Sequence, residues 1–168
     1  EDCAREVLDK TAPRVMGVLK PLKVVITNYS EDKTEDFQPA RHPKNPKMGN
    51  RKVPFSREIY IDHDDFREDP PPNYFRLAPG KEVRLRYAYV IRCDEVIYDE
   101  TGKVSELRCT YDPATRSGAK AEGRKVKGII HWVSAKDSIQ VEVRLYDRLF
   151  AKPIPGSDDP EGNFLKDI

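Results

Sequence analysis

The sequence predicts a mainly β protein of closed antiparallel barrels with one short helix at its N-terminus. Runs of β-branched and aromatic residues alternate with polar residues, which is the period of a half-buried strand. Turn-forming residues separate these runs, and they include 14 prolines and 9 glycines. Strands of this length at this spacing are typical of closed antiparallel barrels.

The chain is long enough to bury a core, because 168 residues suffice for one domain or for two small barrels that share one. Its 38% hydrophobic and 35% charged residues exclude an intrinsically disordered chain. No run approaches the roughly 18 apolar residues that a membrane span requires. The chain opens with neither a methionine nor a signal peptide, so we expect a fragment of a longer cytoplasmic protein with no membrane partner.

Only two stretches favour helix. Residues 2–10 have apolar side chains at helical spacing, and Pro13 ends this pattern. The second candidate, residues 62–69, begins with acidic side chains, which suit a helix N-terminus. The sequence Asp-His-Asp-Asp at 62–65 also has the chemistry of metal ligands. Adjacent side chains point in different directions and no second ligand cluster stands out, so we expect a helix start and no metal.

The predicted strands, in chain order, are residues 14–19, 22–29, 56–61, 82–98, 104–111, 125–133 and 139–150. The run 82–98 alternates most regularly, and it places Arg84 and Arg86 on one polar face. Residues 99–103 predict a hairpin turn, which would set Cys93 opposite Cys109. The three cysteines form no Cys-x-x-Cys pair, so we expect reduced thiols, with neither a disulfide framework nor a zinc site.

The net charge is only +1, but the charges are segregated along the chain. Residues 41–57 contain six lysines and arginines and no acid, and residues 116–127 contain five against Glu122. Such stretches allow one basic face, which a phosphate backbone requires. Solvated loops are the alternative.

No catalytic site is predicted. His131, Ser134 and Asp137 are the residue types of a catalytic triad, but no Gly-x-Ser-x-Gly nucleophile motif accompanies them. Residues 118–125 approach a phosphate-binding loop, yet the Gly-Lys-Ser/Thr that should open a helix is missing. We therefore expect a basic hairpin loop there and no cofactor in this chain.

The stretch 73–86 has the composition of an RNA-reading surface, because it interleaves aromatic residues with arginines. Unpaired bases are recognised by stacking on aromatic or guanidinium planes and by hydrogen bonds at their edges. Arg76, Arg84 and Arg86 could supply both. A solvated strand face with weak ion pairs is the alternative interpretation.

The chain resembles the C-terminal half of glutaminyl-tRNA synthetases over nearly its full length. Two of the matching blocks are Pro21-Leu-Lys-Val-Val-Ile-Thr-Asn-Tyr29 and His131-Trp-Val-Ser134. The others lie at residues 12–14, 42–49, 53–61, 74–77, 80–86, 88–92, 109–113, 123–128 and 143–150. The resemblance implies two adjoining antiparallel β-barrels that hold the anticodon loop of the glutamine tRNA. Residues 1–20 would end a linker or helical region, and 21–168 would be the barrels, truncated at the C-terminus.

Site residues follow from the resemblance by position. Arg84 would bind the first anticodon base, Arg76 the third, and Arg14 would line the pocket of the central uridine. Lys44 and Asn73 would add contacts, although the family has Asn and Gln at these two positions. The sequence also departs from the family at Phe75, where a Lys is familiar, and at Asp9, where an Asn is.

The resemblance also implies the activity of the parent enzyme, a glutamine–tRNA ligase. ATP and Mg²⁺ would bind in a catalytic domain outside this chain. That domain would be a partner of this chain, and the glutamine tRNA would be the other. We expect the protein to be a monomer. Two alternatives remain: the related barrel of an archaeal or eukaryotic glutamyl-tRNA synthetase, and a protein-interaction barrel that does not bind RNA.

Overall fold

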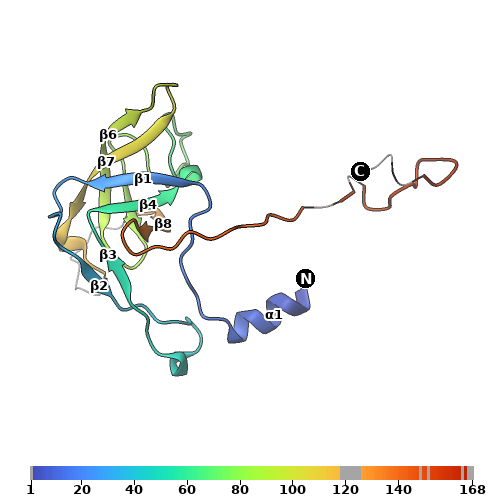
Figure 1. Ribbon diagram of the computed structural model, residues 1–168, viewed down its shortest axis with the longest axis horizontal. Helices are drawn as coiled ribbons and strands as arrows, with labels where there is room; N and C mark the ends of the chain where they lie inside the picture. The colour runs from blue at the N-terminus through green and yellow to red at the C-terminus, as the bar shows by residue number, and fades with distance from the viewer. Residues whose placement is uncertain (1, 118–125, 148, 151, 164, 166–168) are drawn as a thin grey trace.

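The computed structural model describes residues 2–117, 126–147, 149–150, 152–163 and 165. It is mainly β, as predicted, and most strands belong to one curved sheet with the order β8-β5-β6-β7-β1-β4-β9 (Figure 1). Those strands are β1 (Pro21–Ile26), β4 (Glu58–Asp62), β5 (Glu82–Leu85), β6 (Val90–Tyr98), β7 (Val104–Asp112), β8 (Ile129–Ile130) and β9 (Val133–Ser134). A separate antiparallel pair joins β2 (Glu35–Phe37) and β3 (Val53–Phe55).

The sheet is so curved that one short chain segment, residues 129–134, supplies the strands at both of its edges. β8 pairs with β5 and β9 pairs with β4, and only His131 and Trp132 separate β8 from β9. The sheet is mixed rather than antiparallel throughout, because β1–β7 and β5–β8 are parallel pairs. The second barrel of the predicted pair is not seen among the described residues.

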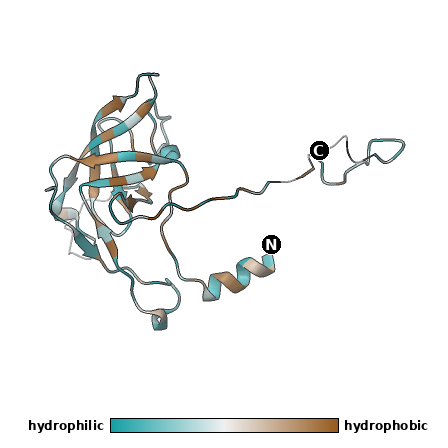
Figure 2. Cartoon of the chain, viewed as in Figure 1, coloured by the Kyte–Doolittle hydropathy of each residue, from teal (hydrophilic) through white to brown (hydrophobic). Residues whose placement is uncertain are grey.

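Aromatic rings fill the interior of the sheet. Trp132 is fully buried and packs edge-to-face on Phe55, with 5.2 Å between the ring centroids. Its Nε1–H donates a hydrogen bond to the Arg86 carbonyl at 2.9 Å. Tyr29 and Tyr89 extend this cluster with further edge-to-face contacts. Each such side chain contributes about 1.5–3 kcal/mol by leaving water. In the same view as Figure 1, Figure 2 shows hydrophobic residues alternating with hydrophilic ones along the strands.

The predicted strand 82–98 is wrong as a single element. β5 ends at Leu85 and β6 begins at Val90, and between them Tyr87 turns the chain with a φ of 67°. The turn is closed by hydrogen bonds from the Leu85 N–H to the Tyr89 carbonyl and from the Ala88 N–H to the Leu85 carbonyl. Arg86 therefore lies in this turn and not on a continuous face with Arg84.

Two other predicted strands are also absent from the described structure. Residues 14–19 and 139–150 have no ladder partner, and the latter segment runs away from the sheet (Figure 1). The predicted strand 125–133 is shortened to β8, because the chain bends at His131 and Trp132 before β9. A strand needs a neighbour to bond its backbone, and the sequence pattern does not supply one.

The helix predictions are partly confirmed. α1 (Asp2–Thr11) forms as expected and lies apart from the sheet (Figure 1). The candidate at 62–69 shrinks to the 3₁₀ turn η2 (His63–Asp65), whose N-cap Asp62 accepts a hydrogen bond from the Asp64 N–H. Two more 3₁₀ turns are η1 (Pro46–Met48) and η3 (Pro113–Thr115). In the described part of the chain, no helix has the length and hydrophobicity to cross a membrane.

The predicted hairpin between β6 and β7 is confirmed. The Asp99 N–H donates to the Lys103 carbonyl at 2.8 Å, and Gly102 has a φ of 78°. Cys93 lies opposite Cys109, and both are free, buried thiols. The hydrogen bond with Cys93 and then burial raise the pKa of the Cys109 thiol, so it stays protonated. The basic loop predicted at 118–125 lies outside the described residues.

Candidate nucleic-acid interface

Arg14 and Lys44 share one carboxylate, that of Asp9 at the end of α1. The Arg14 guanidinium lies 2.6 Å from Asp9 Oδ1, and the Lys44 ammonium lies 2.8 Å from Asp9 Oδ2. The hydrogen bond from Lys44 is the largest cause that holds the pKa of Asp9 below its ordinary value. The structure thus brings together two of the five predicted site residues, which are 30 positions apart in the sequence.

A buried histidine fixes this cluster to the loop between β2 and β3. The Lys44 N–H donates to His42 Nδ1 at 3.1 Å, so Nε2 carries the proton and donates to the Asp9 carbonyl at 2.6 Å. The Arg14 N–H adds a backbone bond to the Arg41 carbonyl at 2.6 Å. His42 therefore holds the end of α1 against the basic loop.

In the described structure the other two predicted arginines, Arg76 and Arg84, have separate partners. Arg76 is half exposed, and its guanidinium pairs with the nearly buried carboxylate of Asp65 in η2. Arg84 lies on β5, and its guanidinium donates one hydrogen bond to the Thr115 carbonyl at 2.9 Å. Both arginines are therefore held in place by the protein, and each has further donors directed elsewhere.

Asn73 is exposed in the turn after the triple proline, with no side-chain hydrogen bond to any described residue. Asp9, Arg14 and Lys44 share no hydrogen bond or ion pair with Arg76 or Arg84 among the described residues. Of the five predicted site residues, the structure thus joins only Arg14 and Lys44 by shared contacts, through Asp9.

The basic run 41–57 is less basic in the structure than in the sequence. Lys44 pairs with Asp9, Lys52 with Asp36 at 2.7 Å, and Arg57 with Glu31 at 3.2 Å. Arg51 is partly buried, and burial lowers the pKa of its guanidinium. The prediction of one uniformly basic stretch therefore missed that acids from other segments neutralise half of it.

Sequence reasoning named Arg86 as a possible base contact but did not identify its neighbours at the β5–β6 turn. Arg86 lies over the Tyr87 ring at 5.1 Å, and His131 lies close enough to Arg86 and Arg76 to feel their charges. Burial and then these two guanidinium groups lower the pKa of His131. Arg86 ends the stretch 73–86 that interleaves aromatics with arginines and Tyr87 follows it, but no sequence signal placed His131 beside them.

The described residues show no catalytic centre. Ser134 is buried, and its hydroxyl donates to Asp137 Oδ2 at 2.9 Å and lies 3.0 Å from the Ser56 hydroxyl. The His131 side chain is partly desolvated but still open to solvent, and it has no hydrogen bond to Ser134, so these residues do not form a triad. Within the described ranges, no three His, Cys, Asp or Glu side chains gather into a metal site.

Comparison with known proteins adds two family matches. The family described as "tRNA synthetases class I (E and Q), anti-codon binding domain" matches residues 12–112, and a second model with the same description matches residues 129–167. The chain is also 55% identical over its whole length to a glutamine–tRNA ligase of Bradyrhizobium diazoefficiens, of which it covers 29%.

Two further relatives give the same result. The glutamine–tRNA ligase of Pseudomonas putida is 59% identical over 98% of the chain, which covers 29% of that protein. The glutamine–tRNA ligase of Stutzerimonas stutzeri is 57% identical over the whole chain, which covers 30% of that protein. The chain thus spans about three tenths of the length of the relatives that it matches.

Proposed function

The chain belongs to the anticodon-binding domain family of the class I tRNA synthetases for glutamate and glutamine, and from this membership we propose that it binds the anticodon loop of a glutamine tRNA. The observation that carries the proposal is the match of 55–59% identity to glutamine–tRNA ligases along the chain. The guanidinium groups of Arg76 and Arg84, each held by a contact to the protein, support it, because planar donors held in place suit the edges and faces of unpaired bases.

In this proposal Arg84, Arg76 and Arg14 bind the three anticodon bases, and Lys44 and Asn73 add contacts. The protein as a whole would ligate glutamine to its tRNA with ATP, in a catalytic domain of the same protein that this chain contacts. We further propose that it works as a monomer in the cytoplasm. No residue of this chain is assigned to ATP or Mg²⁺.

The test is the affinity of the chain for a glutamine tRNA transcript after substitution of Arg84 or Arg76. By analogy with base contacts in DNA, each bidentate contact contributes about 1–3 kcal/mol, so each substitution to Ala should raise Kd about 5- to 150-fold. Arg92→Ala is the matched control, since Arg92 is 55% exposed and ion-paired like Arg76, which is 52% exposed. Wild-type Kd values for both variants would contradict the assignment.

Arg76 needs a second variant, because Arg76→Ala also leaves the carboxylate of Asp65 unpaired. Arg76→Lys keeps a positive charge beside Asp65 but loses the planar fork. It should fold like the wild type, as shown by circular dichroism, and still lose tRNA affinity. Competition between glutamine and glutamate tRNAs separates the proposal from its glutamyl alternative, since only the glutamine tRNA should displace the bound transcript.

A further inference from the structure

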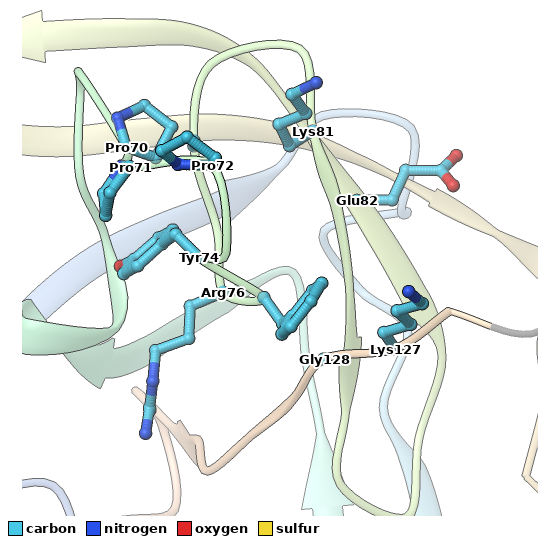
Figure 3. A pocket seen from close by; sticks show the side chains of 11 residues that line it. Pro70, Pro71, Pro72, Tyr74, Arg76, Lys81, Glu82, Lys127 and Gly128 are labelled. Atoms are coloured by element: carbon cyan, nitrogen blue, oxygen red, sulfur yellow. The ribbon is translucent and has the colours of Figure 1, made fainter.

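A pocket of about 330 Å³ opens beside the start of β5, next to Arg76 (Figure 3). The prolines 70–72 form one wall, and Phe75, Lys81 and Lys127 lie around the rest. The Arg76 side chain also borders the pocket, but its guanidinium extends away from the prolines and Lys81 (Figure 3) and pairs with Asp65. The lysines, rather than Arg76, therefore bring positive charge to this space.

The backbone builds the pocket through one close approach. A Cβ at Gly128 would overlap the carbonyl oxygen of Phe75 and lie 3.1 Å from Val83 Cγ2, so only glycine lets the chain entering β8 pass there. This passage sets Lys127 beside Phe75, with the ammonium 5.0 Å from the ring centroid. The ring remains 50% exposed. A cation thus lies over one face of an aromatic side chain that remains half exposed.

The charges of the pocket favour an anionic ligand. Lys81 is exposed and has no side-chain hydrogen bond or ion pair with any described residue. Lys127 contacts the Phe75 ring, and Glu82 is the only acid that lines the pocket. Two ammonium groups next to an aromatic face match a nucleotide, in which a phosphate adjoins a flat base.

We propose that this pocket binds one unstacked nucleotide of the RNA loop, with its base on the Phe75 ring and its phosphate on Lys127 and Lys81. The inference rests on the proposed function and adds to it a stacking residue that the arginine assignments lack. Phe75 then contributes stacking, which does not depend on the identity of the base.

The experiment measures Kd of the full chain for a glutamine tRNA transcript and for transcripts with an abasic residue at one loop position at a time. Stacking on an aromatic side chain contributes about 1–3 kcal/mol, so Phe75→Ala should weaken binding of the intact transcript about 5- to 150-fold. The same substitution should have no effect on the one transcript whose stacked base is missing. Phe75→Trp should restore the affinity.

Lys127→Gln and Lys81→Gln should each reduce the slope of log Kd against log salt by about 0.7. Lys103→Gln, at the tip of the β6–β7 hairpin, is the control for charge. Tyr98→Ala is the control for an aromatic side chain, because Tyr98 is also 50% exposed but lies outside the pocket.

The possible outcomes separate the two proposals. If the intact transcript does not bind, or if no abasic position weakens binding, the proposed function fails and the inference fails with it. If binding depends on the loop bases but Phe75→Ala binds like the wild type, only the stacking pocket is wrong. Equal weakening of every abasic transcript by Phe75→Ala would also overturn it, because the effect would then be structural.

Discussion

A single carboxylate, Asp9, controls two of the cations that are proposed to meet RNA. Arg14 and Lys44 are partly exposed, and exposed ion pairs are worth only about 0–1 kcal/mol. A phosphate or base edge can therefore take over either cation at little cost. In the free protein Asp9 holds both side chains together, and in a complex its negative charge would oppose the incoming phosphate.

The substitution Asp9→Asn tests this balance. It removes the negative charge that repels the RNA phosphate and keeps the size of the side chain. Loss of a repulsion of about 0.5–1 kcal/mol should raise the affinity for glutamine tRNA about 2- to 5-fold at low salt. Asp36→Asn is the control, because Asp36 pairs with Lys52, which is outside the proposed site. A fall in affinity for Asp9→Asn, measured by fluorescence titration, would mean that orientation of Arg14 outweighs repulsion.

At this scale the sequence predicted the cations but not their partners. Arg14, Arg76 and Arg84 were assigned from the resemblance alone. The partners Asp9, Asp65 and Thr115 come from other segments or from across a proline, and only the folded chain brings them within reach. Periodicity and composition contain no information on contacts of this kind, since they describe one segment at a time.

His131 makes the stability of the fold depend on pH. Burial and the charges of Arg86 and Arg76 lower the pKa of its imidazole from the ordinary value of 6.5. The unfolded chain then binds the proton more readily, so the free energy of unfolding should fall as the pH drops through about 6.5 towards the lower folded-state value. Urea unfolding at several pH values should show this slope, and His131→Gln should reduce it. His63→Gln, an exposed histidine in η2, is the control; an unchanged slope in His131→Gln would contradict the assignment.

At the scale of elements, the turn between β5 and β6 explains why one strand was predicted where two exist. The turn contains no Gly, Pro or Asn between Leu85 and Val90, so the usual signals are missing. Leu85 and Tyr89 are four positions apart and both are buried, as the alternation requires, but Ala88 and Val90 are buried as well, so the in–out alternation is interrupted at the turn. The β6–β7 hairpin was predicted correctly, because its turn contains the usual signal, Gly102.

Tyr87 stores backbone strain at this turn, which a pair of substitutions can measure. With a φ of 67°, a residue that has a Cβ is disfavoured by about 1–2 kcal/mol relative to glycine. Tyr87→Gly and Tyr87→Ala both lose the ring, so the Gly variant should be more stable than the Ala variant by about 1 kcal/mol in urea unfolding. At Ser105, an exposed position of β7, the order should reverse. Equal stabilities of the two Tyr87 variants would show that the turn relaxes without cost.

On the scale of the whole molecule, the described chain is a curved seven-stranded sheet and the β2–β3 pair around one core, with two segments outside it. The core residues lie between Leu22 and Trp132, and no described residue after Ser138 belongs to that core. Ile139, Val141 and Leu145 are largely exposed, although their alternation led to the prediction of a strand. The alternation of residues 139–150 is that of a strand, but in the described structure no neighbouring strand pairs with this segment and buries its apolar face.

Because the C-terminal segment lies outside the described core, a shortened chain that ends at Ser138 should fold with nearly the stability of the full chain. Because the deleted residues add nothing to the described core, its thermal midpoint by circular dichroism should stay within a few degrees of that of the full chain. Removing exposed apolar side chains should also reduce self-association in sedimentation velocity. A chain that ends at Ile130 is the control: it lacks Trp132 and β9, so the sheet can no longer close onto β4 and the cooperative transition should be lost. If the chain ending at Ser138 unfolds like this control, residues beyond it stabilise the sheet, and the sheet is not an independent folding unit.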